Sequence, residues 1–375
     1  MKLKIVLILI VFFVSVVCPK SAWAYAGGPS GIYALDSSQG ANRDANIRNY
    51  SFVTGYVWRM SWADFELSKD NYNFSKIDDI ISRLQPINKK LSIILGGADS
   101  LEPGYITSLP PDSGFSSVVT WSDPNAGIRA VPWDSWLLYR FNKFTQALAS
   151  HQVGGISLCN HPILANINLG IAGLGEIRER PGVEISNFSG YTRTNFINAV
   201  KSSLHAQTDQ FPSKFVYVGF WKVTDANSSP ELWEETRTNI LNEFNGINYP
   251  RVGFWMENLA ASANTANLSD PLRVVTATPT TDYASALYLS KNSTFIMFQA
   301  LASWLGAGSD PLNQHYTKLV NGVPSDGIQY AYNTFESKYF ELYVPDLDNP
   351  SYQPSFQYWH NSFIPPAAPT GLMVT

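Results

Sequence analysis

The stretch GYVWRMSWADFELSKDNYNFSKIDDII, residues 55–81, contains one complete change from strand-like to helix-like sequence. Its start belongs to an apolar run, Val53–Trp58, which has the length of a buried strand. Near its end, isoleucines stand at positions 77, 80 and 81 and are followed by Leu84, a spacing that places all four side chains on one face of a helix. The stretch therefore predicts a β-strand followed by an amphipathic helix.

Similar strand-like segments recur along the rest of the chain, and several alternate with helix-like ones. The candidate strands are too apolar to be covered on one face only, as is typical of buried parallel sheets. They are Gly31–Asp36, Val53–Trp58, Leu91–Leu95, Leu164–Ile171, Phe215–Trp221, Arg251–Met256, Thr294–Gln299 and Tyr339–Val344. Helical spacing also marks the ranges 136–148, 232–244 and, more weakly, 283–288.

Eight strands with helices between them predict an α/β protein with one (β/α)8 barrel, the TIM barrel. The alternative is a doubly wound open sheet, which usually carries an early glycine-rich turn for phosphate. Gly96 and Gly97 are the candidates for such a turn, and they lack its spacing. The barrel is therefore favoured, with a long proline- and glycine-containing loop over residues 96–132, after the third strand.

The N-terminus has the pattern of an export signal. Lys2 and Lys4 precede the apolar run Ile5–Val17, and the small residues Ala22 and Ala24 flank Trp23 as in a cleavage site. The run is shorter than the ~20 apolar residues that span a membrane. We therefore expect a cleaved signal peptide over residues 1–24, no membrane span in the mature chain, and a secreted, periplasmic or cell-surface location.

The predicted barrel domain covers residues 25–364. Residues 365–375 form a Pro/Ala-rich linker running into a short apolar segment that resembles the opening strand of a fibronectin type III module.

Composition and motifs exclude several function classes. The net charge is −4 and only 15% of residues are charged, so the chain has no basic footprint for nucleic acid. The five histidines have no metal-ligand spacing, and neither HExxH nor GxSxG is present. We expect no metal, no cofactor and a monomer. Aromatic residues make up 14% of the chain, a high share that suits proteins that stack rings on sugars.

The run GYVWRMSWADFELSKDNYNFSKIDDII also resembles the second βα unit of the clan-A glycoside hydrolases, the beta-galactosidase and cellulase superfamily. The resemblance is strongest over residues 53–97 and continues loosely to the eighth strand. It implies that Arg59 hydrogen-bonds the catalytic nucleophile, because a guanidinium keeps a neighbouring carboxylate ionised. The alternative for Arg59 is a surface salt bridge with Asp64 or Glu66.

The same resemblance points to Glu176, after the fourth strand, as the general acid/base. Hydrolysis of a glycosidic bond needs one carboxylic acid to protonate the leaving oxygen, and Gly173 and Gly175 would allow a tight turn there. The sequence departs from the family pattern at this point, because Gly175 stands where an asparagine is expected. The alternative is a structural glutamate that caps the next turn or pairs with Arg178 or Arg180.

The second carboxylate is less clear, because the seventh strand ends in Gln299 where the family keeps its nucleophile. A neutral amide cannot be that nucleophile. Three explanations remain open: the strand count is off by one and Glu257 is the nucleophile; the second carboxylate is Glu257 or Glu341 from another strand; or the barrel binds sugar without cleaving it. Glu341 could face the barrel interior or pair with Lys338 or Arg273.

Several tryptophans near strand ends are candidate sugar-stacking residues, although each could equally be a core residue. They are Trp58, Trp62, Trp221, Trp255 and Trp304. We therefore predict an exported glycoside hydrolase that acts on a poly- or oligosaccharide. Its site would be formed by these tryptophans and by Arg59, Glu176, Glu257, Glu341 and Gln299. The alternative is a catalytically inactive barrel that binds extracellular or cell-surface glycan.

Overall fold

A computed structural model describes residues 27–35, 49–95, 102–110, 112–123, 127–170, 184–220, 223–227, 229–259, 284–300, 303–305 and 323–363. Eight parallel strands close into a barrel in the order β1-β14-β13-β12-β11-β10-β5-β2. Their bounds are β1 (Gly31–Leu35), β2 (Val53–Met60), β5 (Lys90–Leu95), β10 (Leu164–Asn168), β11 (Phe215–Gly219), β12 (Val252–Leu259), β13 (Ile296–Ala300) and β14 (Tyr339–Tyr343). The prediction of a (β/α)8 barrel is confirmed.

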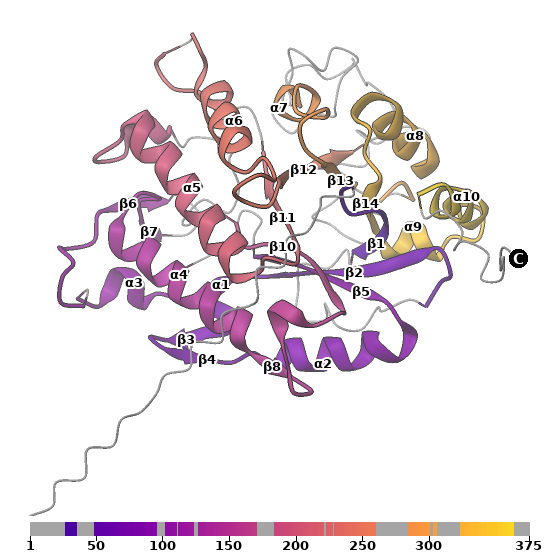
Figure 1. Ribbon diagram of the computed structural model, residues 1–375, viewed down its shortest axis with the longest axis horizontal. Helices are drawn as coiled ribbons and strands as arrows, with labels where there is room; N and C mark the ends of the chain where they lie inside the picture. Colours follow the sequence, from indigo (N-terminus) through magenta and orange to yellow (C-terminus); the bar gives the residue numbers. More distant parts are fainter. Residues whose placement is uncertain are drawn as a thin grey trace, which may run out of the picture.

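Helices lie around the outside of the strands and follow one another in chain order (Figure 1). The described helices are α1 (Trp62–Phe65), α2 (Ser75–Leu84), α3 (Tyr105–Ser108), α4 (Ser135–Ser150), α5 (Arg193–Gln210), α6 (Leu232–Glu243), α7 (Ser285–Tyr288), α8 (Pro324–Phe335), α9 (Val344–Asp348) and α10 (Gln353–Phe363). Short 3-10 turns are η1 (Gln85–Ile87), η2 (Leu158–Asn160) and η3 (Ile185–Asn187). Among the described helices, none combines the length and the hydropathy that crossing a membrane requires.

Three small antiparallel hairpins lie outside the barrel: β3 (Glu66–Ser68) with β4 (Asn71–Tyr72), β6 (Thr120–Asp123) with β7 (Gly127–Ala130), and β8 (Gln152–Val153) with β9 (Ile156–Ser157). The long loop predicted after the third strand contains α3 and the β6–β7 hairpin. A buried ion pair holds the segment before α3 to the hairpin, because Arg129 of β7 donates to Glu102 at 2.7 and 3.0 Å. The predicted signal peptide and residues 365–375 lie outside the described residues.

Side chains alternate along each strand between the barrel interior and the layer under the helices. On β14, Tyr339 and Glu341 point into the barrel, whereas Phe340 and Leu342 belong to the outer core. Interior aromatic rings need space that a neighbouring glycine supplies. A Cβ atom on Gly253 would lie 1.9 Å from the ring of Phe295. The interior is thus filled by rings, with polar groups near its carboxyl end.

Candidate active site

Three of the predicted site residues meet at the carboxyl end of the barrel, where barrel enzymes carry out their chemistry. Arg59 lies at the end of β2, Glu257 near the end of β12 and Gln299 near the end of β13. The Arg59 guanidinium donates through Nη2 to Oε1 of Gln299. The same Nη2 lies 3.6 Å from Oε2 of Glu257. One cation therefore contacts a carboxylate and a carboxamide that come from two other strands.

This cluster is mostly, but not completely, shielded from solvent. The side chains of Arg59 and Glu257 are 14% and 20% exposed, so solvent and a ligand can reach them. Trp255, two residues before Glu257 on the same strand, is buried, and its ring lies 5.5 Å from the Arg59 guanidinium carbon. This distance is within the range of a cation–π contact. The indole thus lies against the inner side of Arg59, and at 1% exposed it is too buried to be the sugar-stacking residue that the sequence suggested.

Gln299 links the cluster to the last strand. Its amide nitrogen donates to the hydroxyl of Tyr343 at 3.3 Å and to the carbonyl of Ala300 at 3.3 Å. Burial raises the pKa of Tyr343 to about 12, against the opposing charge of Arg59, so this phenol stays neutral. Gln299 is itself buried, and it serves as a hydrogen-bonding bridge between Arg59 and Tyr343.

Glu341 lies on β14 beside Gln299 in the strand register and is fully buried inside the barrel. The sequence left the orientation of the Glu341 side chain open, and in the structure this side chain faces the barrel interior. Its Oε1 accepts hydrogen bonds from Tyr339 at 3.1 Å and Tyr217 at 3.4 Å. Burial raises the pKa of Glu341 to about 7, while the charge of Arg59 opposes this rise. The structure thus has one accessible and one buried carboxylate near Arg59.

The surface-salt-bridge alternative for Arg59 is wrong, because both candidate partners have other roles. Asp64 and Ser61 form a capping box at the start of α1. Glu66 is fully buried and pairs with Arg140 of α4 at 2.5 Å. The Arg59 side chain instead points into the barrel mouth, where it contacts Glu257 and Gln299.

Two of the tryptophans proposed for sugar stacking lie in the core between the barrel and the helices. Trp58 packs edge-on against Phe65 and is 2% exposed. Trp62 packs against Phe141 and Phe144 and donates to Glu66 at 2.8 Å. Trp58 points away from the interior because Val57 and Arg59, its neighbours on β2, point inward. We therefore do not retain either indole as a ligand contact.

Trp304 is half-buried and lies in the loop that follows β13. The carboxylate of Asp346, on α9, holds this loop by accepting from the hydroxyl of Ser303 at 2.9 Å and the amide of Leu305 at 3.1 Å. Trp304 therefore remains a candidate at the barrel mouth. Glu176 and Trp221 lie outside the described residues.

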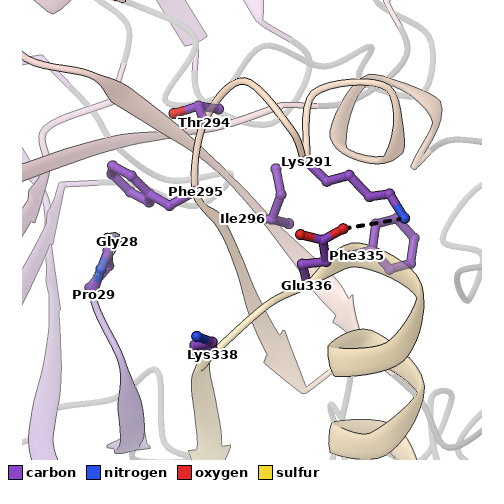
Figure 2. A pocket seen from close by; sticks show the side chains of 9 residues that line it. All are labelled: Gly28, Pro29, Lys291, Thr294, Phe295, Ile296, Phe335, Glu336 and Lys338. Atoms are coloured by element: carbon purple, nitrogen blue, oxygen red, sulfur yellow. Dashed lines mark ion pairs between the residues drawn. The ribbon is translucent and has the colours of Figure 1, made fainter. Parts of the chain in front are cut away.

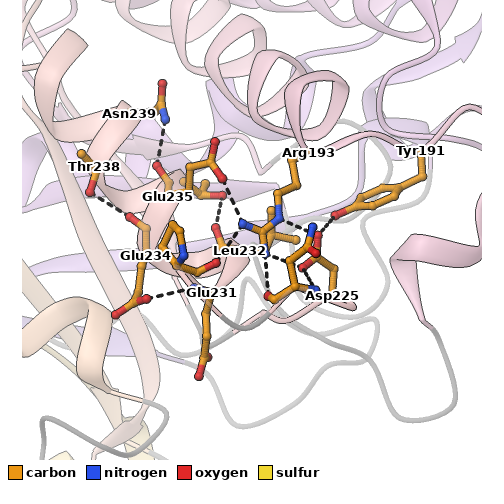
Figure 3. A network of polar contacts seen from close by, with 12 residues as sticks. Tyr191, Arg193, Asp225, Glu231, Leu232, Glu234, Glu235, Thr238 and Asn239 are labelled. Carbon is orange, nitrogen blue, oxygen red and sulfur yellow. Dashed lines mark hydrogen bonds and ion pairs between the residues drawn. The ribbon is translucent and has the colours of Figure 1, made fainter.

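A polar network that the sequence did not reveal joins the start of α5, with the residues just before it, to the segment after β11 (Figure 3). Arg193 donates to Asp225 through two nitrogens at 2.5 and 2.7 Å, and Tyr191 donates to the same carboxylate at 2.6 Å. Arg193 also donates to the carbonyls of Asn227 and Pro230. The guanidinium thus fastens the loop that leads from β11 into α6.

We expect Asp225→Asn to destabilise the protein at neutral pH but not in strong acid. The hydrogen bonds from Arg193 lower the pKa of Asp225 to about 2, against burial, so the ionised form stabilises the fold. This contribution, on the order of 2 kcal/mol, is present above the ordinary aspartate pKa near 4 and is lost as pH falls toward 2. Thermal unfolding of both proteins between pH 2 and pH 7 measures it.

Asp79→Asn is the matched control, since Asp79 is 58% exposed and pairs with Arg83 along one helix. A stability difference between wild type and Asp225→Asn that did not shrink below pH 4 would contradict the role given to this ion pair.

One pocket lies at the opposite, amino end of the barrel (Figure 2). Gly28 and Pro29 before β1, Phe295 before β13 and Lys338 before β14 line it. Lys291 lies 3.9 Å from Glu336 at its side, and this glutamate is 60% exposed. The amino end of such barrels usually serves stability rather than catalysis. Within the described residues, no group of three or more His, Cys, Asp or Glu side chains could hold a metal ion.

No protein-family model matches the chain, and no curated protein sequence matches it significantly. Solved structures do resemble it at low sequence identity. Endoglucanase Cel5A of Pseudomonas stutzeri is 12% identical, with 89% of this chain and 95% of that chain covered and a TM-score of 0.44. Xylanase 10B of Thermotoga maritima is 11% identical, with coverages of 84% and 82% and a TM-score of 0.43. A beta-galactosidase from Marinomonas ef1 is 9% identical, with coverages of 83% and 55% and a TM-score of 0.49. All three similarities are distant, with identities of 9–12% and TM-scores below 0.5.

Proposed function

We propose that the protein is a divergent clan-A-like glycoside hydrolase that cleaves O-glycosidic bonds of a poly- or oligosaccharide. The observation that carries this proposal is the contact of one arginine, Arg59, with Glu257 and Gln299 at the carboxyl ends of three barrel strands. A guanidinium that holds a carboxylate in a partly exposed mouth is an arrangement suited to charge-stabilised sugar chemistry.

In this proposal Glu257 is the carboxylate that faces the sugar, and Glu176 is the acid that protonates the leaving oxygen. Arg59 orients Glu257 and balances its charge at a distance of 3.6 Å. The separation of Glu176 and Glu257 decides the stereochemistry: about 5 Å corresponds to retention and about 6.5–9.5 Å to inversion. The assignment of Glu176 rests on the family resemblance of the sequence.

A second candidate function is glycan binding without cleavage. Its support is Gln299, which occupies the position of the family's nucleophile and uses its amide to bridge Arg59 and Tyr343. A neutral amide supplies no nucleophile, so a barrel with Gln299 at this position could bind a sugar without cleaving it. Binding of a glycan that wild type never cleaves would favour this second candidate.

Export of the protein is part of the same proposal, because polysaccharides are met mainly outside the cytoplasm. Mass spectrometry of the N-terminus of protein recovered from the medium or periplasm tests it. We expect the mature chain to start at Tyr25, with the barrel domain as the next segment and the Pro/Ala-rich linker at its end. An N-terminus that retains the leader would contradict the cleavage.

The hydrolytic proposal is tested by incubating wild type and Glu176→Gln with a panel of plant, microbial and animal glycans and measuring released reducing ends. We expect wild type to cleave at least one glycan and the variant to be slower by about 10²–10⁴-fold, the usual contribution of a general acid. Unchanged turnover of Glu176→Gln would remove this glutamate from the mechanism.

A further inference from the structure

Tyr343 is the last residue of β14 and lies at the carboxyl end of the barrel. Along this strand, the side chains of Tyr339 and Glu341 point into the barrel and are fully buried. Tyr343 follows at the same two-residue spacing, so its ring points to the same side of the sheet. It packs against the interior rings but is only partly buried. The phenol of Tyr343 therefore lies in the barrel mouth, beside the proposed site.

Arg59 fixes the orientation of the Gln299 amide. A guanidinium has five N–H donors and no acceptor. Because Nη2 of Arg59 donates to Gln299, the amide must turn its oxygen, Oε1, toward Arg59. The amide nitrogen then faces the other way, 3.3 Å from the hydroxyl of Tyr343 and 3.3 Å from the carbonyl oxygen of Ala300. The opposite orientation would bring donors together at Arg59.

The fixed amide decides how the Tyr343 hydroxyl is used. A phenol has one hydrogen to donate and lone pairs that accept. Because Gln299 donates to this hydroxyl, the phenolic hydrogen must point elsewhere. Burial raises the pKa of Tyr343 to about 12, so the hydrogen is present at neutral pH.

The nearby acids do not accept the hydrogen of Tyr343. In the carboxyl groups of Glu341 and Asp346, one oxygen is bonded to other donors and the second has no hydrogen-bond partner among the described residues. Within the part of the chain that the structure describes, no acceptor receives this hydrogen. The hydroxyl can therefore donate to a ligand in the mouth.

We propose that Tyr343 is a substrate-binding residue whose hydroxyl donates a hydrogen bond to an oxygen of the bound sugar. This inference rests on the proposed function. It also gives Gln299 a role, because a glutamate at this position would accept the only hydrogen of the phenol, whereas glutamine leaves it for the ligand. Glu257 accepts from sugar hydroxyls and Tyr343 donates to them, so the mouth supplies both kinds of partner that a sugar needs.

Tyr343→Phe removes the donor and keeps the ring. We expect the dissociation constant of a bound glycan, and KM where the glycan is cleaved, to rise about three- to tenfold, the net contribution of one hydrogen bond. The value of kcat should change less, because a contact made equally in the ground and transition states affects KM alone. The probes are cellohexaose, xylohexaose and mannohexaose, with each glycan of the panel that wild type binds. Tyr358→Phe is the matched control, because Tyr358 is 64% exposed on α10.

A double-mutant cycle separates a contact with sugar from a merely structural role of the hydroxyl. In Gln299→Glu, the carboxylate keeps Arg59 as its partner and accepts the hydrogen of Tyr343. Removing the hydroxyl in this background should cost no further affinity, so the double variant should bind glycan as Gln299→Glu does, within about twofold. If Tyr343→Phe weakened binding equally in both backgrounds, the proposal would be overturned.

Neutron diffraction from deuterium-exchanged crystals tests the geometry on wild-type protein alone. We expect two deuterons on the Gln299 nitrogen that faces Tyr343, and the Tyr343 deuteron pointing away from Gln299. A deuteron that Tyr343 donates to Gln299 would overturn the inference.

The outcomes also separate this inference from the proposed hydrolysis. If Tyr343→Phe cleaves glycan with the KM of wild type, the inference fails and the hydrolysis stands. If wild type binds a glycan that it never cleaves, and Tyr343→Phe binds it more weakly, only the hydrolysis fails. If wild type binds no glycan, both are wrong.

Discussion

Glu257→Gln is expected to reduce glycan hydrolysis by at least about 10³-fold, the scale on which loss of an essential catalytic group lowers turnover. The carboxamide has the size of the carboxylate but has neither its charge nor its nucleophilicity. It also ends the 3.6 Å charge contact with Arg59, which keeps its hydrogen bond to Gln299. The fold should be unaffected because Glu257 is partly exposed. Initial rates and glycan affinity, measured on the same protein preparation, provide the test.

Affinity is expected to stay within a few-fold of wild type, since the carboxamide has the size of the carboxylate and the remaining groups of the mouth are unchanged. Glu184→Gln is the control, because this glutamate is exposed and lies in the segment before η3. If Glu257→Gln cleaved glycan as fast as wild type, Glu257 would have no part in the chemistry. In that case the carboxylate that faces the sugar would have to come from another strand.

The largest effect on stability is expected for Arg140→Met. Arg140 is buried on α4 and donates to Glu66 at 2.5 Å, to Asp70 at 2.9 Å and to the hydroxyl of Tyr105 at 2.9 Å. Methionine would leave the fully buried Glu66 carboxylate without its cation. Breaking a buried ion pair in this way costs about 3–5 kcal/mol. Chemical denaturation at pH 7 measures the free energy of unfolding.

Arg83→Met is the matched control. Arg83 is also a helical arginine paired with an acid, Asp79, but both side chains are substantially exposed. Pairs of this kind contribute less than about 1 kcal/mol. Equal destabilisation by the two substitutions would show that burial of the Arg140 network does not stabilise the fold as we describe.

The eight barrel strands could be predicted because each is a short apolar run covered on both faces, and such runs differ sharply from the segments around them. Helices were harder to predict where polar residues occupy buried positions. On α5, Ser203, Gln207 and Thr208 are buried, which interrupts the apolar spacing. On α8, Pro324 and Gly327 lie in the first turns and reduce the helical signal, although proline is well tolerated at that end.

The convergence of Arg59, Glu257 and Gln299 could also be predicted, because parallel barrel strands end on one face and residues after them must meet there. The direction in which individual side chains point was harder to predict from the sequence. A difference of one position along β2 separates Trp58 in the outer core from Arg59 in the mouth. The position of a strand end in the sequence does not determine which of two neighbouring side chains points into the barrel.

The buried network around Glu66 was missed, yet one signal for it exists in the sequence. Arg140 lies four residues after Trp136 and four before Phe144, so it falls on the apolar stripe of its helix. A charged residue at such a position requires a buried partner. Its partner, Glu66, is 74 residues away in sequence, and only the fold brings the two together.

The position of a bound sugar tests the proposed site most directly. An oligosaccharide that wild type cleaves can be soaked into crystals of Glu257→Gln, which should bind it without turnover. We predict that a sugar ring lies across the carboxyl end of the barrel, with the residue 257 amide within about 3.5 Å of the reacting carbon. A sugar seated elsewhere, for example at the amino-end pocket beside Lys291 and Glu336, would contradict the assignment.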